Sequence, residues 1–393
     1  MKKRLLFKKL VEYLEHKNAL IITGMRQVGK TTLMKQVFET VKNPKLWFDF
    51  DNPFDLLHFE NIDYDAIYYK LIKEANSKDK RLFIFIDEIQ NYPEITKIIK
   101  YHIDKYSVKY VVSGSSNYYL KNLFPESLSG RKFLFVLNPL SFSEFLYFNN
   151  KIEEPVNNEN IQNLLKDYSL LEYKKNELEY IEFMEYGGFP EVVSTENIET
   201  KKMILKNIFT SFFEKDIKII SDIKDIRELR DLILLLIPRI GNILDVMKLS
   251  NDLGINRVKI YSYLDLLQGV FFLRLIPKYS KSIDRSVAGG RKVYFSDTGL
   301  LNIIGRVNEG QLFENTISNQ LANYGEVSYY NKRNKAEIDF ILDKAYAFEV
   351  KNTVHPKDLL KLERNAKEIG IDKFYMISKV FVEIKNTIFP QMI

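Results

Sequence analysis

One stretch near the start of the sequence constrains the fold more than any other: Leu20-Ile-Ile-Thr-Gly-Met-Arg-Gln-Val-Gly-Lys-Thr-Thr32. Residues 19–23 are apolar or β-prone without interruption, which is typical of a strand covered on both faces. Gly24 and the triplet Gly29-Lys30-Thr31 have the Walker A spacing, and apolar residues then recur at helical intervals. The stretch therefore predicts a buried strand, a phosphate-binding loop and a helix, in that order.

Phosphate binding explains each of the residue types in this loop. Gly24 and Gly29 let the backbone curl so that successive N–H groups point at phosphate oxygens. Lys30 is expected to reach the β- and γ-phosphates, and Thr31, followed by Thr32 in the same loop, to bind Mg²⁺ through its hydroxyl. The positive end of the following helix points at the same anion. The alternative is a chance glycine turn before an ordinary helix.

A second hydrophobic run, Arg81-Leu-Phe-Ile-Phe-Ile-Asp-Glu88, ends in two adjacent carboxylates, which is the Walker B layout. Phosphoryl transfer needs one carboxylate beside Mg²⁺ and another that orients or deprotonates the attacking water. We expect Asp87 in the first role and Glu88 in the second. The acidic first turn of a helix gives a similar pattern, but the Walker A stretch upstream favours the nucleotide interpretation.

Polar residues follow the next predicted strand, residues 109–112. Ser115 and Asn117 are candidates to sense the γ-phosphate, although an ordinary Gly-Ser turn gives the same pattern. Arg131 precedes a further apolar strand. It could neutralise transition-state charge across a subunit boundary, which would make the protein a homo-oligomer, or it could form a surface salt bridge.

Length and composition set wider limits. A chain of 393 residues is expected to form roughly two to four domains. The net charge of +6 permits binding to nucleic acid without arguing for it. The absence of cysteine excludes disulfides, thiol nucleophiles and cysteine zinc sites. No apolar run approaches the ~20 residues that span a bilayer, so we expect a cytoplasmic protein with no membrane partner.

The motifs of the first half resemble those of AAA+-type P-loop ATPases, in the broad group of archaeal-type or prokaryotic predicted ATPases. The resemblance rests on Gly24–Thr32, Phe85–Gln90, Ser113–Ser116 and Leu128–Arg131, and it extends into Asn138–Phe145 and Tyr186–Glu191. It implies a parallel α/β ATPase core over residues 1–140, a helical lid over 141–225, and ATP with Mg²⁺ as the bound nucleotide and ion.

Residues 226–300 predict a winged helix. A helix, a turn at Gly254 and a second helix capped by Asn256 are followed by strands at 270–276 and 292–295. We expect the second helix to bury one face and the loop between the strands to be a basic wing. The inward face is predicted to consist of Val258, Tyr261, Leu264 and Leu267.

The same module is a candidate DNA-binding surface. Arg257 and Lys259 lie near the start of the second helix, where a reading helix contacts the groove, and the loop would touch phosphate. The basic residues of the loop are Lys278, Lys281, Arg285 and Arg291. A winged helix that serves only for packing is the alternative, and the apolar run 266–272 favours it.

Residues 301–393 predict a helix, three strands, a helix and a strand. The strands are expected at 326–330, 337–342, 345–351 and 373–378, and the helices at 312–321 and 357–369. Glu349 and Lys351 are two apart on a strand and share a face. Asp339 and Glu349 can converge on one divalent ion, with Lys351 beside the attacking hydroxide and Glu314 completing the ligands.

This arrangement resembles the PD-(D/E)xK nuclease superfamily, which implies catalytic positions for Asp339, Glu349 and Lys351. An alternating strand with a solvated acidic face, or an inactive domain retained for packing, is the alternative. The overall prediction is an α/β chain with a P-loop sheet, a helical lid, a winged helix and a nuclease-like domain. Its function would be an ATP-hydrolysing switch that acts on DNA through this domain, or an ATP-dependent DNA- or protein-binding regulator in which the domain is inactive.

Overall fold

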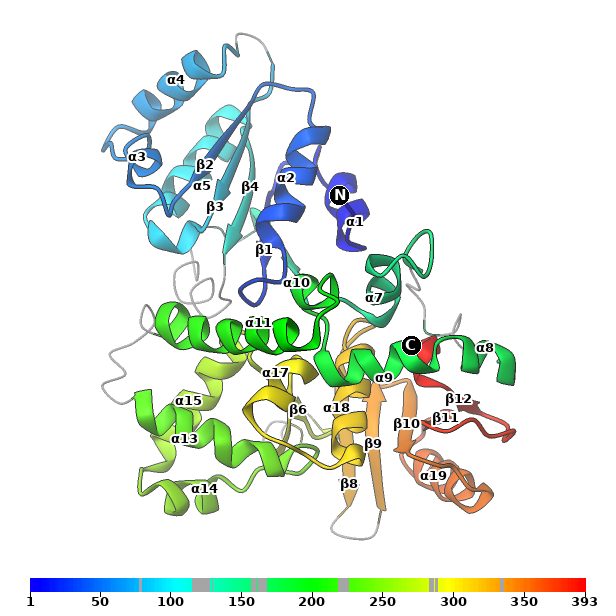
Figure 1. Cartoon of the computed structure of the whole chain (residues 1–393). Helices are drawn as coiled ribbons and strands as arrows, with labels where there is room; N and C mark the ends of the chain where they lie inside the picture. The colour runs from blue at the N-terminus through cyan, green and yellow to red at the C-terminus, as the bar shows by residue number, and fades with distance from the viewer. Residues whose placement is uncertain are drawn as a thin grey trace. The chain divides into compact units, whose positions relative to one another are not determined.

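The computed structural model of the chain describes residues 1–77, 80–114, 128, 130–156, 161, 168–217, 226–282, 286, 289–332 and 336–393. These residues form two compact units (Figure 1). The first comprises Met1–Asn138 with Ser211–Asp222 and Gly269–Phe271, and the second comprises Pro139–Thr210, Ile223–Gln268 and Phe272–Ile393. The predicted lid, winged helix and C-terminal domain therefore lie almost entirely in one unit.

The first unit contains a five-stranded sheet of order β2-β3-β4-β1-β5 in which all neighbouring strands are parallel. Its strands are β1 (Ala19–Thr23), β2 (Lys45–Asp49), β3 (Phe83–Asp87), β4 (Lys109–Gly114) and β5 (Lys132–Val136). Every residue of β1, β3 and β4 is buried, as continuous apolar runs predict for central strands. The α/β fold class is thus confirmed, with β4 lying between the two strands that carry the Walker motifs.

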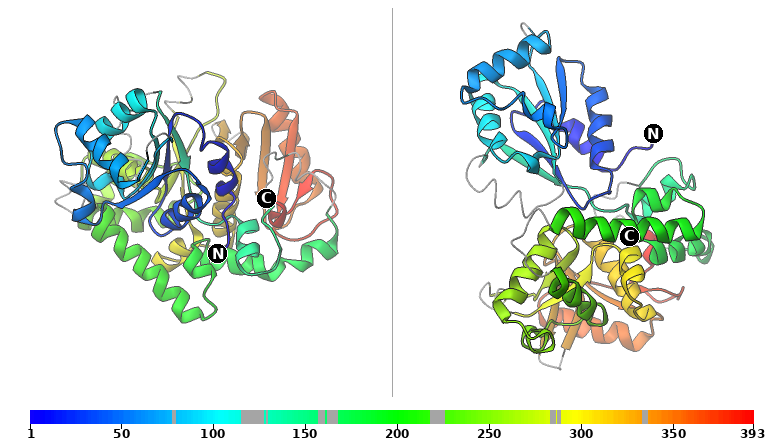
Figure 2. Two further views of the ribbon diagram at one scale, coloured as in Figure 1. Left: turned by 90° about the horizontal axis from the view of Figure 1, so that it is seen from above. Right: turned by 60° about the vertical axis from the view of Figure 1, so that its left-hand side comes forward.

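Helices cover both faces of this sheet. They are α1 (Leu6–Glu12), α2 (Lys30–Thr40), α3 (Pro53–Leu56), α4 (Tyr64–Glu74) and α5 (Ile95–Tyr106), with a 3₁₀ turn η1 (Ile89–Asn91). Alternate strand residues point to opposite faces, so Ile84 and Ile86 join the core under α4 and α5. Phe85 points the other way and meets Phe38 of α2 edge to face, with ring centroids 5.0 Å apart. The right-hand view of Figure 2 shows α2, in darker blue, on one side of the sheet and the lighter helices α4 and α5 on the other.

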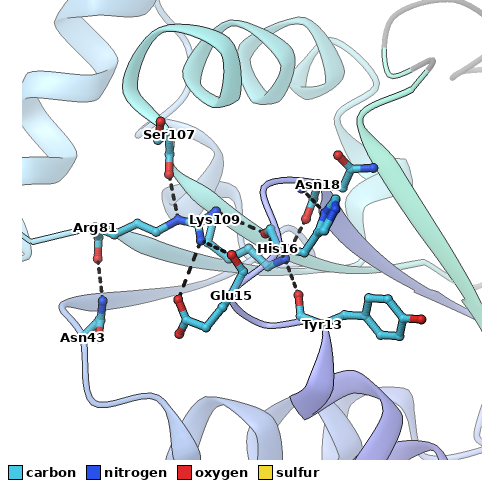
Figure 3. Close-up of polar contacts among 8 residues, drawn as sticks. All are labelled: Tyr13, Glu15, His16, Asn18, Asn43, Arg81, Ser107 and Lys109. Carbon is cyan, nitrogen blue, oxygen red and sulfur yellow. Dashed lines mark hydrogen bonds and ion pairs between the residues drawn. The ribbon is translucent and has the colours of Figure 1, made fainter.

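A buried lysine fixes the segment that leads into β1. Lys109, the first residue of β4, donates hydrogen bonds to the backbone carbonyls of Tyr13, His16 and Asn18 at 2.9, 2.8 and 2.7 Å (Figure 3). Arg81 adds bonds to the carbonyls of Glu15 and His16. Burial, with the Arg81 charge second, lowers the pKa of Lys109 to about 7. The three carbonyls compensate for the water that the ammonium has lost.

Lys109→Met is expected to destabilise the first unit by about 2–3 kcal/mol at pH 6, where the ammonium is charged, because buried carbonyls lose a donor. The only tryptophan in the sequence is Trp47 on β2, so its fluorescence during denaturant unfolding reports this unit alone. Lys97→Met is the control, because Lys97 is exposed and pairs with neighbouring Glu94 on the surface. It should change stability by less than about 0.5 kcal/mol. Equal stability of the two variants would contradict a stabilising role for Lys109.

The second unit begins with the helical segment predicted as a lid. Its helices are α7 (Phe142–Phe148), α8 (Leu170–Lys175), α9 (Glu177–Tyr186), α10 (Pro190–Val193) and α11 (Ile198–Ser211), followed by a π-helical turn η3 (Phe212–Ile217). Ser141 begins α7 with a capping box, since its hydroxyl accepts from the Glu144 N–H while the Glu144 carboxylate accepts from the Ser141 N–H. Phe142 and Phe145 of α7 pack against Phe183 of α9 and hold these two helices together.

The turn after α9 depends on a buried carboxylate. Gly187 has φ +74°, and a Cβ there would lie 2.3 Å from both Asp297 carboxylate oxygens. Asp297 caps α17 (Thr298–Ile304) by accepting from the Leu300 N–H, and it also accepts from the Gly188 N–H at 2.8 Å. Burial raises the pKa of Asp297 to about 6. Asp297 thus joins two segments that are far apart in the sequence.

The predicted winged-helix elements are present: helices α13 (Ile226–Leu236), α14 (Val246–Leu253) and α15 (Arg257–Gly269), a 3₁₀ turn η4 (Ile237–Arg239), and an antiparallel pair of β6 (Leu273–Pro277) with β7 (Arg291–Phe295). The inward face predicted for α15 was half wrong. Leu264 and Leu267 are buried, but Val258 and Tyr261 are 75% and 56% exposed, and Ile260 and Tyr263 take their place. Apolar residues lie on both sides of this helix, so spacing alone did not fix its orientation.

The C-terminal sheet has the order β12-β11-β10-β9-β8, with β8, β9 and β10 antiparallel and β10, β11 and β12 parallel. Its elements are α18 (Glu309–Leu321), β8 (Val327–Lys332), β9 (Ala336–Leu342), β10 (Tyr346–Lys351), α19 (Pro356–Glu368), β11 (Lys373–Ser378), β12 (Thr387–Ile388) and a final turn η5 (Pro390–Met392). Helix α19 packs on β9, β10 and β11. The predicted order of helix, three strands, helix and strand is confirmed.

Candidate nucleotide site and a C-terminal acidic cluster

The predicted phosphate-binding loop lies between the carboxyl end of β1 and the first residue of α2. Gly24 has φ +149°, and a Cβ there would lie 2.1 Å from the Leu137 carbonyl oxygen, so this position needs glycine. Gly29 has φ +95° and begins α2 with no side-chain cap. The first N–H groups of a helix have no intrahelical acceptors, so an uncapped start suits a phosphate group.

The Lys30 side chain turns back over this loop. Its ammonium donates to the carbonyl oxygens of Gly24 and Met25, each at 2.9 Å, and the residue is only 6% exposed. The two carbonyl oxygens compensate for the burial of the ammonium and hold it over the loop. Thr31 follows it in the first turn of α2 and is partly buried, whereas Thr32 is exposed. The loop geometry therefore fits the hydrogen-bond donors that a nucleoside triphosphate requires.

The Walker B carboxylate lies at the same edge of the sheet. Asp87 ends β3 and is buried. Strand β4 pairs with both β3 and β1, so the carboxyl ends of these three strands are neighbours. One Asp87 oxygen accepts a hydrogen bond from the Ser113 hydroxyl and another from the Glu88 N–H at 3.1 Å. Parallel strands thus bring the Walker B carboxylate to the edge where the phosphate loop begins.

Glu88, the residue after β3, has an unusual backbone conformation. Its φ of +53° is in the left-handed region, which is unusual for a residue with a side chain. Burial raises the pKa of Glu88, while the charges of Lys30 and Arg26 act in the opposite direction. The Gln90 amide donates to the Glu88 carboxylate. A half-buried carboxylate beside Lys30 can serve as the base predicted for this position.

Two residues that support this site were not selected from the sequence. Ser113 holds Asp87, and its place at the polar end of a buried strand was the available signal. Arg4 donates to the carbonyl of Val28 in the phosphate loop and to that of Asn138, each at 2.9 Å. No local pattern indicates Arg4, because these partners are distant in sequence.

The remaining nucleotide-site candidates are placed differently. Ser115 and Asn117 lie outside the described residues. Arg131 lies just before β5, and Ala19 at the start of β1 donates its N–H to the Arg131 carbonyl. Arg131 is thus at the opposite end of the parallel sheet from the loop, where it pairs with Asp104 at 2.6 Å. Within one chain it does not join the site, so its role across a subunit boundary stays a prediction.

A second group of charges lies in the C-terminal part of the chain. Glu314 comes from α18, and Glu337 and Asp339 come from β9. The ammonium of Lys292 on β7 lies 3.9 Å from Glu314, 3.0 Å from Glu337 and 3.9 Å from Asp339. Burial favours the neutral amine, but the three carboxylates outweigh it and raise the pKa of Lys292. Sequence reasoning missed this lysine, because it predicted β7 only as part of a wing.

Glu349 and Lys351 lie beside this group on β10. Their carboxylate and ammonium are 3.0 Å apart, as expected for residues that share a face. They line a cavity of about 50 Å³ together with Glu337 and with Asp358 and Lys361 of α19. Burial, with the nearby Asp339 charge second, raises the pKa of Glu349. The structure therefore brings the predicted residues Asp339, Glu349 and Lys351 into one region.

With ammonium groups among them, the carboxylates of Glu314, Asp339 and Glu349 are not spaced as metal ligands. Within the described part of the chain, no three acidic, histidine or cysteine side chains converge as a metal-binding group. Ammonium groups pair with these carboxylates instead, Lys292 with Glu314 and Asp339, and Lys351 with Glu349. The metal site predicted from Glu314, Asp339 and Glu349 stays a prediction.

Comparison with known families agrees with the first site. Residues 16–146 match the family described as an AAA domain. Residues 177–311 and 309–386 match two domains of unknown function, DUF8612 and DUF4143. The AAA match includes both Walker motifs, so residues 16–146 form a P-loop domain of the AAA class. These matches assign no nuclease activity to the C-terminal residues.

Similar proteins extend over nearly the whole chain. An uncharacterized protein of Haemophilus influenzae is 29% identical over 93% of this chain and 92% of its own length. One from Methanocaldococcus jannaschii is 28% identical over 90% of this chain and 79% of its own length. The solved structure of a Walker-type ATPase of Pyrococcus abyssi has a TM-score of 0.50 at 14% identity, covering 76% of this chain and 94% of that one. At this identity, the likeness concerns the fold alone.

Among the helices that the structure describes, none combines the length and the apolar character needed to cross a bilayer.

Proposed function

We propose that this protein is a switch that binds ATP and hydrolyses it with Mg²⁺. Its main support is that Lys30, Asp87 and Glu88 lie at the carboxyl edge of one parallel sheet, beside a helix that begins without a side-chain cap. The match of residues 16–146 to an AAA domain supports it.

Each residue has a role that its position supports. Backbone N–H groups from Gly24 to Thr31 and the Lys30 ammonium would bind the β- and γ-phosphates. Asp87 and the Thr31 hydroxyl would hold the magnesium ion, and Ser113 orients Asp87. Bound Mg²⁺ would neutralise charge on the phosphate oxygens. Glu88 would accept the proton of the attacking water, which needs the ionised carboxylate.

The direct test is phosphate release by the purified full-length chain at saturating ATP. We expect steady turnover that requires Mg²⁺ and stops when EDTA is added. The absence of turnover above that of buffer, with and without double-stranded DNA, would contradict the proposal. DNA is included because a switch that DNA activates would hydrolyse ATP slowly without it.

Two functions are open for the C-terminal domain, and one observation favours the second. The domain could cleave DNA with a divalent ion, or it could serve an ATP-dependent regulator without nuclease chemistry. Lys292 within 3.9 Å of the candidate ligands Glu314 and Asp339 favours the regulator. Plasmid incubated with Mg²⁺ or Mn²⁺ should therefore remain intact. Cleavage that Glu349→Ala or Lys351→Ala abolishes would establish the nuclease instead.

The winged-helix elements are the candidate DNA contact. The charge available there is limited, since Lys259 pairs with Glu228. Arg257 at the start of α15 and Arg291 at the start of β7 are exposed, and both could meet phosphate. The affinity for random duplex should fall as salt rises. If no binding to DNA is detected even at low salt, the partner of this module would be a protein instead.

A further inference from the structure

Lys292 is a buried lysine whose ammonium lies among three carboxylates. Lys292 is only 3% exposed, and its nitrogen lies within 4 Å of Glu314, Glu337 and Asp339. A buried charge is stable only when it is paired, and three carboxylates exceed what one ammonium needs. Three carboxylates around one position favour a cation there, and the Lys292 ammonium occupies that position.

The backbone and ring contacts of Lys292 hold the ammonium there. The β7 backbone pairs with β6 through Ile276 and with Ile243 on its other side. The ammonium lies 5.5 Å from the centre of the Tyr329 ring, which favours a cation. The carboxylates are fixed as well. Glu314 accepts from the Tyr294 hydroxyl at 2.7 Å, and Asp339 accepts from the Val350 N–H at 2.9 Å.

A second, independent observation shows a vacant acceptor in this region. Within the described chain, the Oε2 atom of Glu349 is buried and has no hydrogen-bond partner, and the residue is only 7% exposed. Its other oxygen pairs with Lys351. A buried carboxylate oxygen without a donor is costly unless a cation can approach it. Glu349 therefore offers one coordination position beside Asp339.

We propose that the Lys292 ammonium is the resident cation of this acidic cluster and closes it to divalent metal ions. Carboxylate oxygens bind Mg²⁺ or Ca²⁺ at about 2.0–2.6 Å. An ion at that distance from Glu314 and Asp339 would have to share the space with an ammonium of the same sign. Replacing Lys292 by an uncharged residue leaves Glu314, Asp339 and the free oxygen of Glu349 to bind a metal. This inference is independent of the ATPase proposal, because all its residues lie in the second unit.

The test is calorimetric titration of Mn²⁺ into the full chain without ATP. Every protein carries Asp87→Asn, which removes the Walker B aspartate as a possible ligand for the ion. We expect Lys292→Met to bind one Mn²⁺ at least about tenfold more tightly than the parent does. Lys292→Arg keeps the positive charge and should behave as the parent. Lys292→Met combined with Asp339→Asn should lose the gain.

Two results would overturn the proposal. One is a folded Lys292→Met protein that binds Mn²⁺ no better than the parent. The other needs no substitution of Lys292: Mn²⁺ binding by the parent that Asp339→Asn abolishes would show that the metal and the ammonium coexist. This second comparison decides the matter even if Lys292→Met fails to fold. An absence of Mn²⁺ binding by the parent supports the proposal.

Discussion

Replacing Lys30 by alanine should lower the rate of ATP hydrolysis by at least about 100-fold, the usual cost of removing a group aimed at transition-state charge. The loss should be this large because the Lys30 ammonium is buried over the phosphate loop and its charge cannot be replaced by water. The measurement is phosphate release at saturating ATP and Mg²⁺. The variant should remain folded, since the Lys30 ammonium donates to two carbonyls of its own loop, those of Gly24 and Met25.

Lys35→Ala is the matched control for this experiment. Lys35 lies on the same helix, is exposed, and faces the Trp47 ring rather than the loop. It should hydrolyse ATP within about twofold of the parent. Trp47 fluorescence during unfolding shows whether either variant has lost the first unit. A folded Lys30→Ala protein with parental turnover would remove the P-loop from the mechanism.

Glu88→Gln should separate binding from hydrolysis. The amide has nearly the same size but cannot accept a proton from water, so hydrolysis should fall by about 10²–10⁴-fold. ATP affinity should stay within a few-fold of the parent, because Glu88 is not among the phosphate-binding groups. The two quantities to measure are single-turnover hydrolysis and ATP binding.

Glu94→Gln serves as the control for this second experiment. Glu94 lies on the surface just before α5 and pairs with Lys97 there. It should retain full hydrolysis. A Glu88→Gln protein that loses ATP binding and hydrolysis equally would show that Glu88 supports the structure of the site rather than the attack of water.

The phosphate loop fold and the Walker B strand were predictable because the information for them is local. The strand, loop and helix that contain Gly24 and Lys30 are contiguous, and an unbroken hydrophobic run marks the strand that ends at Asp87. Parallel pairing then brings the two motifs to one edge, as the Walker spacing implies. The C-terminal order of elements was also predictable, since β11 begins and ends where its sequence pattern does.

Features that depend on distant partners were not predictable from one sequence. Arg4 supports the loop through Val28, and Lys292 meets carboxylates from two other elements. Nothing in the neighbouring residues of either one indicates these contacts. The prediction of the buried face of α15 was half wrong for a different reason. Val258 and Tyr261 give that helix a second apolar side, and residue spacing does not show which side is buried.

Calorimetric titration of ATP with Mg²⁺ into the full-length protein tests the central claim most directly. We expect one nucleotide to bind per chain, with the affinity reduced at least about tenfold in Lys30→Ala, which lacks the ammonium proposed to bind the phosphates. Two results together would contradict this claim: the folded parent shows no heat of binding at any temperature tried, and ATP displaces no fluorescent ATP analogue from it.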